Sequence, residues 1–213
     1  MALICLLLVI LLLGSVGYAF GWILFKRIPD CRRQGLELVN QDLHLALEPG
    51  ERIFRWLRLK RPERLRGLYR FHEVEILREQ ASSGGRFQTL EVLRMACPGP
   101  EGIYFELSRA APHFFWLRTW NRGLTRIGDV AFDRHIALRT NAPEWVKEVL
   151  GEPMRARVLE VFGQHRAPGV LAWRDGELTY FEERLFWNAR VARRFIAMVR
   201  LGSEFAIAVK VFT

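Results

Sequence analysis

The sequence predicts an α+β protein in which a transmembrane helix precedes one domain with a mainly antiparallel sheet and two principal helices. Segments of alternating apolar and polar residues follow one another through the middle of the chain, with glycine-rich turns between them. Two later segments repeat apolar residues at helical spacing instead. At the amino terminus, the first charged side chain is Lys26.

The uncharged run Ala2–Phe25 predicts a membrane anchor over residues 1–27. As a helix it would be about 36 Å long, which exceeds the ~30 Å hydrocarbon core of a bilayer. The alternative is a signal peptide cleaved after Ala19. An uncleaved anchor is favoured because no Lys or Arg precedes the apolar run, and because the run continues beyond Ala19.

Charge next to the anchor predicts its orientation. Lys26, Arg27, Arg32 and Arg33 follow the apolar run directly, and positive flanks stay in the cytoplasm. We therefore expect a single-pass protein of a bacterial inner membrane, with its amino terminus outside, a juxtamembrane linker over 28–36 and a cytoplasmic domain over 37–213. Small residues on one face of the anchor predict self-association into a dimer, through Gly14, Gly17 and Gly21.

The strands are expected mainly in the first half of the domain. Glu37–Leu47 is predicted as a strand, with a helix as the alternative. Three further strands are predicted over about Leu68–Arg78, Phe87–Ala96 and Ile103–Arg109. The short glycine-containing turns between these three favour an antiparallel meander.

The second half of the domain is expected to hold the helices. Helical periodicity covers about Pro143–Phe162 and again Leu185–Leu201. Between them, Asp175-Gly176 is typical of a type I′ hairpin turn. The alternation within "EFAIAVKVF", residues 204–212, predicts a closing strand.

The stretch "GDVAFDRHIALRTNAPEW", residues 128–145, has two interpretations. As architecture it is a turn, a strand over "FDRHIALRT" and a helix that begins with Asn141 as its N-cap. As a site it offers Asp129, Asp133 and His135, with Asp133 and His135 on one side of the expected strand. Architecture is favoured, because no further residue at ligand spacing completes a metal or acid–base site.

The same stretch, with the helix, hairpin and closing helix that follow it to Leu201, resembles a pattern in uncharacterised bacterial single-pass membrane-anchored proteins. The resemblance covers about Gly128–Leu201. It implies a bacterial, membrane-anchored protein and no particular activity or catalytic residue.

Two segments combine arginines with aromatic residues, in a chain whose formal net charge is +9. This combination is typical of a contact with anionic lipid, and a protein partner is also expected. Single-stranded nucleic acid could use the same residues but is a less expected partner for a tethered domain. The remaining alternative is a solvated arginine face over core aromatics. The candidate binding residues are Arg52, Arg55, Trp56, Arg58, Lys60, Arg61, Trp116 and Trp120.

The sequence contains no phosphate-binding loop, dinucleotide fingerprint, nucleophile elbow or paired-cysteine metal motif. We therefore predict no cofactor, no metal and no catalytic residue. The expected function is a membrane-tethered, non-catalytic binding or assembly module. The alternative is an enzyme or small-ligand sensor for an anionic, lipid-derived substrate, with Asp129, Asp133 and His135 as its site.

Overall fold

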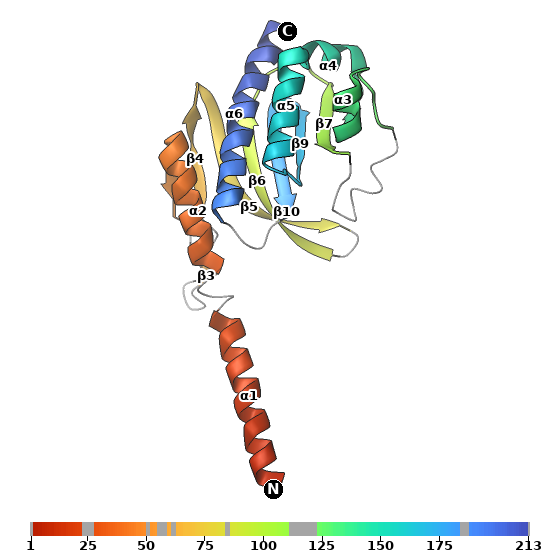
Figure 1. Cartoon of the computed structure of the whole chain (residues 1–213). Coiled ribbons are helices and arrows are strands. Elements are labelled where there is room, and N and C mark those ends of the chain that lie inside the picture. The colour runs from red at the N-terminus through yellow and green to blue at the C-terminus, as the bar shows by residue number, and fades with distance from the viewer. Residues whose placement is uncertain are drawn as a thin grey trace.

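The computed structural model describes residues 2–22, 28–49, 52–54, 59–60, 63–83, 86–110, 123–183 and 188–212. Figure 1 shows the order of the elements along the chain. The helices are α1 (Ala2–Trp22), α2 (Ile28–Leu43), α3 (Val130–His135), α4 (Pro143–Val149), α5 (Glu152–Gln164) and α6 (Ala189–Val211). The strands are β1 (Ala46–Glu48), β2 (Arg52–Phe54), β3 (Leu59–Lys60), β4 (Arg64–Tyr69), β5 (His72–Ser83), β6 (Arg86–Ala96), β7 (Tyr104–Arg109), β8 (Ile136–Thr140), β9 (Val170–Arg174) and β10 (Glu177–Glu183).

An eight-stranded antiparallel sheet forms the centre of the domain. Its strand order is β1-β4-β5-β6-β10-β9-β7-β8, and every neighbouring pair runs antiparallel. The β9–β10 hairpin thus inserts between β6 and β7, although these two strands are consecutive in the chain. The short strands β2 and β3 pair separately.

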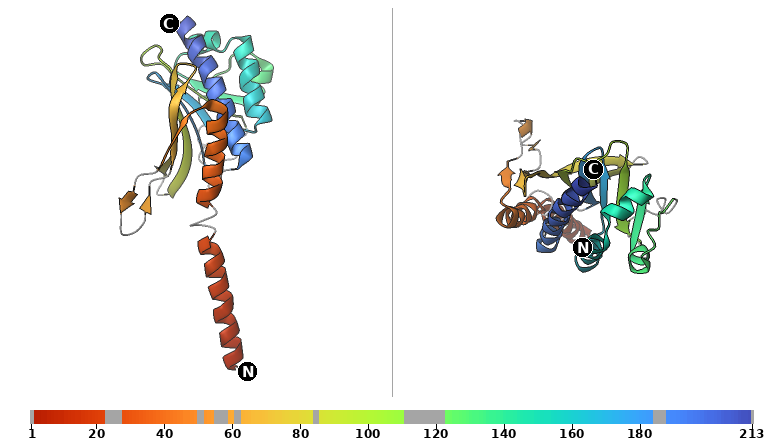
Figure 2. Two further views of the ribbon diagram at one scale, coloured as in Figure 1. Left: turned by 90° about the vertical axis from the view of Figure 1, so that its left-hand side faces the viewer. Right: turned by 90° about the horizontal axis from the view of Figure 1, so that it is seen from above.

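The helices of the domain cover one face of this sheet (Figure 2). Strand β10 shows why, since Leu178, Tyr180 and Glu182 are buried and alternate with more exposed residues. Apolar residues from the sheet, α2, α5 and α6 share one core. The structure is therefore a two-layer α+β fold.

Helix α6 continues through the segment for which a closing strand was predicted, so that prediction is wrong. The alternating apolar residues do not share one buried face, because Phe205 and Val209 are buried whereas Ile207 and Val211 are exposed. That spacing of four residues is helical. Gly202 allows the continuous helix to approach the sheet, since a Cβ at this position would lie 2.9 Å from Leu178 Cδ2.

Helix α2 covers two segments for which other structures were expected. Its first half coincides with the expected linker, residues 28–36. Its second half covers much of the expected strand Glu37–Leu47. Leu36 and Val39 are completely buried and Leu43 nearly so, and their spacing of three and four residues is that of a helix packed on one side. The helical alternative for this segment is thus the one observed, up to Leu43.

No helix in the described part of the chain combines the length and the apolar character needed to cross a membrane. This finding contradicts the predicted single-pass anchor over residues 1–27, the inner-membrane location and the orientation with the amino terminus outside. Figure 1 shows α1 leading away from the domain at the end opposite the carboxy terminus.

Candidate functional site

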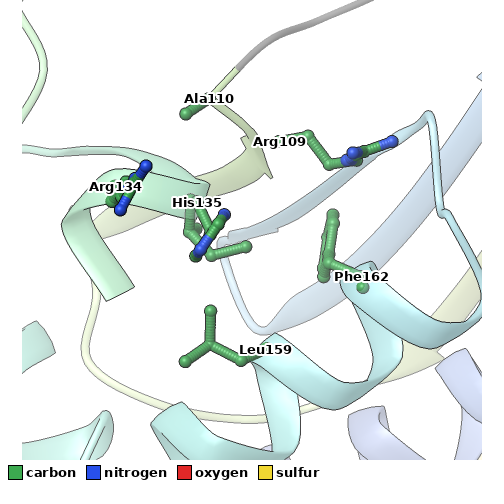
Figure 3. A pocket seen from close by; sticks show the side chains of 8 residues that line it. Arg109, Ala110, Arg134, His135, Leu159 and Phe162 are labelled. Carbon is green, nitrogen blue, oxygen red and sulfur yellow. The ribbon is translucent and has the colours of Figure 1, made fainter. Parts of the chain in front are cut away.

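A pocket of about 490 Å³ lies where β7 and β8 meet the helices α3 and α5. Figure 3 shows it from close by. Its polar side chains are all nitrogen-bearing, and its remaining wall is apolar. The residues that line it are Arg109, Ala110, Arg134, His135, Ile136, Leu159, Phe162 and Gly163.

The antiparallel pairing of β7 with β8 brings the basic residues together. Arg109 ends β7 and is the register partner of Ile136, which begins β8 directly after His135. The backbone N–H of Ala110 donates a hydrogen bond of 2.9 Å to the carbonyl of His135. Residues that are distant in the sequence therefore meet at one edge of the sheet.

Helix α5 supplies the apolar wall of the pocket. Phe162 is buried and Leu159 is half-buried, and their spacing of three residues places both on the same side of the helix. In Figure 3 the His135 ring lies between Arg134 and Arg109, with Leu159 and Phe162 on the helix facing it.

The nitrogen-bearing side chains of the pocket have no partner among the described residues. Within the part of the chain that the structure describes, Arg109, Arg134 and His135 form no side-chain hydrogen bond or ion pair. A guanidinium offers several N–H groups in a planar fork that matches carboxylate and phosphate oxygens.

Asp129 lies close to the pocket in the sequence but serves a structural purpose. Its carboxylate accepts a hydrogen bond from the backbone N–H of Phe132 at 3.0 Å and thereby caps α3. Arg155 of α5 donates to the same carboxylate at 2.9 Å. The hydrogen bond from the Phe132 N–H has the largest effect and lowers the pKa of Asp129 below its ordinary value. Desolvation opposes it, and Arg155 lowers the pKa further.

Asp133 also has a structural role, because its carboxylate binds backbone N–H groups of the preceding loop. Its two carboxylate oxygens accept hydrogen bonds from the N–H groups of Ile127 and Gly128, each at 3.1 Å. These contacts close the loop that leads into α3. Of the three residues in the alternative site, only His135 lines the pocket, and the structure does not bring them together. The segment Val130–His135 is helix and not strand, so the expected same-side arrangement is absent.

Asn141 does not cap α4, contrary to the sequence prediction. The N-cap is Ala142, and no side chain makes the capping hydrogen bond there. Asn141 Oδ1 instead accepts from Tyr104 N at 2.9 Å, and its Nδ2 donates to the Gly102 carbonyl at 2.7 Å. Asn141 therefore fixes the turn before β7 and not the start of α4.

The predicted basic–aromatic binding residues are placed only in part. Arg52 and Lys60 lie in β2 and β3 and are register partners. The others, Arg55, Trp56, Arg58, Arg61, Trp116 and Trp120, lie outside the described residues. A Cβ at Gly14, Gly17 or Gly21 would meet no atom of the described chain within 4 Å. These contacts therefore do not test whether two copies of α1 associate, and self-association through these glycines stays a prediction.

Sequence reasoning missed Arg109, Arg134, Leu159 and Phe162 as members of a common site. Arg134 stands between Asp133 and His135, yet an arginine in a chain rich in arginine gives no signal of its own. A search of the described residues finds no group of three or more His, Cys, Asp or Glu that could hold a metal ion.

Comparison with known proteins gives no family for the chain. No family model matches the sequence, and no curated protein matches it. Among solved structures, the chain is similar to the crystal structure of the mycobacterial trehalose monomycolate transport factor A. The TM-score is 0.45 at 9% sequence identity, over 79% of this chain and 94% of that chain.

Proposed function

We propose that this protein is a non-catalytic binding module, and that the pocket between β7, β8, α3 and α5 binds a small anionic ligand with an apolar portion. One observation carries the proposal: Arg109, Arg134 and His135, which have no side-chain partner among the described residues, line one pocket together with the apolar side chains Leu159 and Phe162. The guanidinium groups match an anionic group, and the apolar wall matches a hydrocarbon group.

The size and composition of the pocket fit this kind of ligand. Pockets for small molecules are typically about 300–1,000 Å³ and mostly apolar, with a few polar groups that orient the ligand. The pocket of about 490 Å³ lies in that range. None of the described residues that line it carries a carboxylate. The carboxylates of Asp129 and Asp133 accept hydrogen bonds from Arg155 and from backbone N–H groups. We therefore propose that the ligand is bound without an acid–base pair that would act on it.

Isothermal titration calorimetry on the full chain tests the proposal with three probes: decyl phosphate, inorganic phosphate and decanol. We expect decyl phosphate to bind more tightly than either other probe, because only it supplies both the anionic and the apolar group. Arg109→Ala and Arg134→Ala should each weaken its binding by about 10- to 150-fold, the equivalent of a charge-assisted hydrogen bond of about 1.5–3 kcal/mol.

Arg66→Ala is the matched control, because Arg66 is an exposed arginine of β4 on a distant strand of the sheet. Its affinity for decyl phosphate should equal that of the unmodified protein. Equal affinities for decyl phosphate and decanol would refute the anionic requirement. Binding that survives both pocket substitutions would place the ligand elsewhere.

A further inference from the structure

We infer that a second site, the shallow groove between α2 and α6, binds an acidic amphipathic segment of a partner protein. This groove has a volume of about 360 Å³. It is separate from the pocket at α3 and α5 and shares none of its lining residues. The residues that line it are Leu38, Gln41, Asp42, Ala189, Ala192, Arg193 and Ile196.

The groove presents apolar side chains in a helical stripe. Ala189, Ala192 and Ile196 follow one another at spacings of three and four along α6, and Leu38 lines the groove from α2. Ala189 is exposed and Ile196 is half-buried, whereas Ala192 is completely buried. Leu38 is 43% exposed, which is high for a leucine beside a helix–helix contact. A groove of this shape suits the apolar face of a short amphipathic segment.

Among the described residues that line the groove, the charge left unpaired is positive, because the single carboxylate is already paired. Asp42 accepts from Arg200 at 2.7 Å. Near it on α2, Glu37 pairs with Arg33 at 3.1 Å. By contrast, Arg193 forms no side-chain hydrogen bond or ion pair with any residue that the structure describes.

Arg190 also occupies a position that opposes the stability of its own helix. It lies in the first turn of α6, which contains no acidic residue, and Arg193 begins the next turn. The amino-terminal end of a helix carries a partial positive charge, so cations there are unfavourable. Both side chains are exposed. The carboxylates of an acidic partner would be attracted by the arginines and by the helix end together.

The groove favours a peptide over other anions. Among the described residues that line it, the apolar side chains are aliphatic, and none is an aromatic ring on which a nucleic-acid base could stack. Arginine forks bind carboxylates through paired hydrogen bonds, which fits glutamate and aspartate side chains.

Fluorescence anisotropy on the full chain tests this inference with a labelled synthetic amphipathic helix that carries leucines on one face and glutamates on the other. A matching peptide with lysines in place of glutamates is the charge control. We expect the glutamate peptide to bind at least about tenfold more tightly than the lysine peptide. Arg190→Glu combined with Arg193→Glu should weaken its binding by at least about tenfold, and Leu38→Ser should also weaken it.

The charge reversal separates binding from folding. Because acidic residues in the first turns suit the helix dipole, the Arg190→Glu, Arg193→Glu protein should melt at the same temperature or higher. Arg66→Glu, an equal charge change on exposed β4, should leave peptide binding unchanged. Unchanged binding after reversal of Arg190 and Arg193 would overturn the inference. Binding to anionic vesicles and to duplex DNA is measured in parallel. If the reversal weakens binding to vesicles or DNA but not to the glutamate peptide, the inference is also overturned.

Discussion

Glu91 and Glu182 are direct register partners across β6 and β10, and both side chains are almost completely buried. Like charges in opposite positions of a sheet destabilise it. Here arginines from other elements compensate them. Arg32 of α2 and Arg78 of β5 bind Glu91, and Arg194 of α6 binds Glu182 at 2.7 Å. Tyr180 donates to Glu182 as well, at 2.5 Å. This network joins both helices to the sheet at one end of the core.

The first prediction concerns the Arg194–Glu182 pair, whose side chains are 2% and 0% exposed. Arg194→Leu should lower the free energy of unfolding by about 3–5 kcal/mol, because it leaves a buried carboxylate without its cation. Glu182→Leu should cost a similar amount. The double variant should lose far less free energy of unfolding than the two single variants added together, because it leaves neither charge unpaired. Urea denaturation of the four proteins measures this, and additive costs would show that the two residues do not interact.

The network of buried ion pairs around Glu91 and Glu182 cannot be predicted from the sequence. The alternation of β10 predicts that Glu182 shares a face with Leu178 and Tyr180, and an isolated glutamate on that face looks unfavourable. Its partner Arg194 lies on α6 directly after Arg193, which is exposed, so the sequence does not distinguish the buried arginine from its neighbour. Sheet strands could be predicted because alternation is local. The pairing of β6 with β10 depends on the insertion of the β9–β10 hairpin, which no local pattern records.

The second prediction distinguishes a turn clamp from a helix cap at Asn141. Asn141→Ala should destabilise the domain by about 1–3 kcal/mol, from two lost hydrogen bonds of about 0.5–1.5 kcal/mol each. In hydrogen exchange, protection should fall at the Tyr104 amide, which donates to Asn141. The first-turn amides of α4 should exchange as before. Faster exchange confined to that first turn would restore the capping interpretation.

The third prediction uses two hairpin tips with positive φ. Phe71 has φ of 72° and is 98% exposed, so its side chain gives little packing in return for the strained backbone. Phe71→Gly should raise stability by up to about 1 kcal/mol, after the greater entropy of the unfolded glycine is subtracted. Gly176→Ala is the converse change, at φ of 78°, and should lower stability by about 1–2 kcal/mol. Thermal unfolding measures both. A lower melting temperature for Phe71→Gly would mean that the exposed ring stabilises the fold.

The fourth prediction concerns acid stability. The pKa of Asp129 is lowered in the folded protein by the Phe132 N–H and then by Arg155. A carboxyl with a depressed pKa stabilises the fold above its unfolded pKa of about 3.9, and this contribution is lost as the pH falls through the folded value. Asp129→Ala should therefore be less stable than the unmodified protein at neutral pH, and the difference should shrink below about pH 4. Glu101→Gln, at an exposed turn, is the control. A difference that is constant from pH 7 to about pH 2 would contradict the assignment.

The candidate pocket illustrates a different limit. The sequence drew attention to His135 through its acidic neighbours, but the structure joins His135 to Arg109 and to the side of α5. That association arises because β8 pairs with β7 and α5 packs beside them. Residue types can suggest metal or acid–base chemistry within one stretch. A site assembled from one arginine on each of two elements and an apolar helix face requires the tertiary fold.

The last prediction separates Asp133 from His135, two residues apart in the chain. Asp133→Ala removes the acceptor for the Ile127 and Gly128 amides, so it should lower the melting temperature by several degrees through loss of about 1–3 kcal/mol. Asp133→Asn keeps one acceptor oxygen and should recover part of that loss. His135 is exposed and unbonded within the described chain, so His135→Ala should leave the melting temperature nearly unchanged. The same substitution should weaken decyl phosphate binding by about tenfold, because it removes a donor from the pocket. A His135→Ala protein that unfolds at lower temperature yet binds the probe normally would show that His135, like Asp133, is only structural.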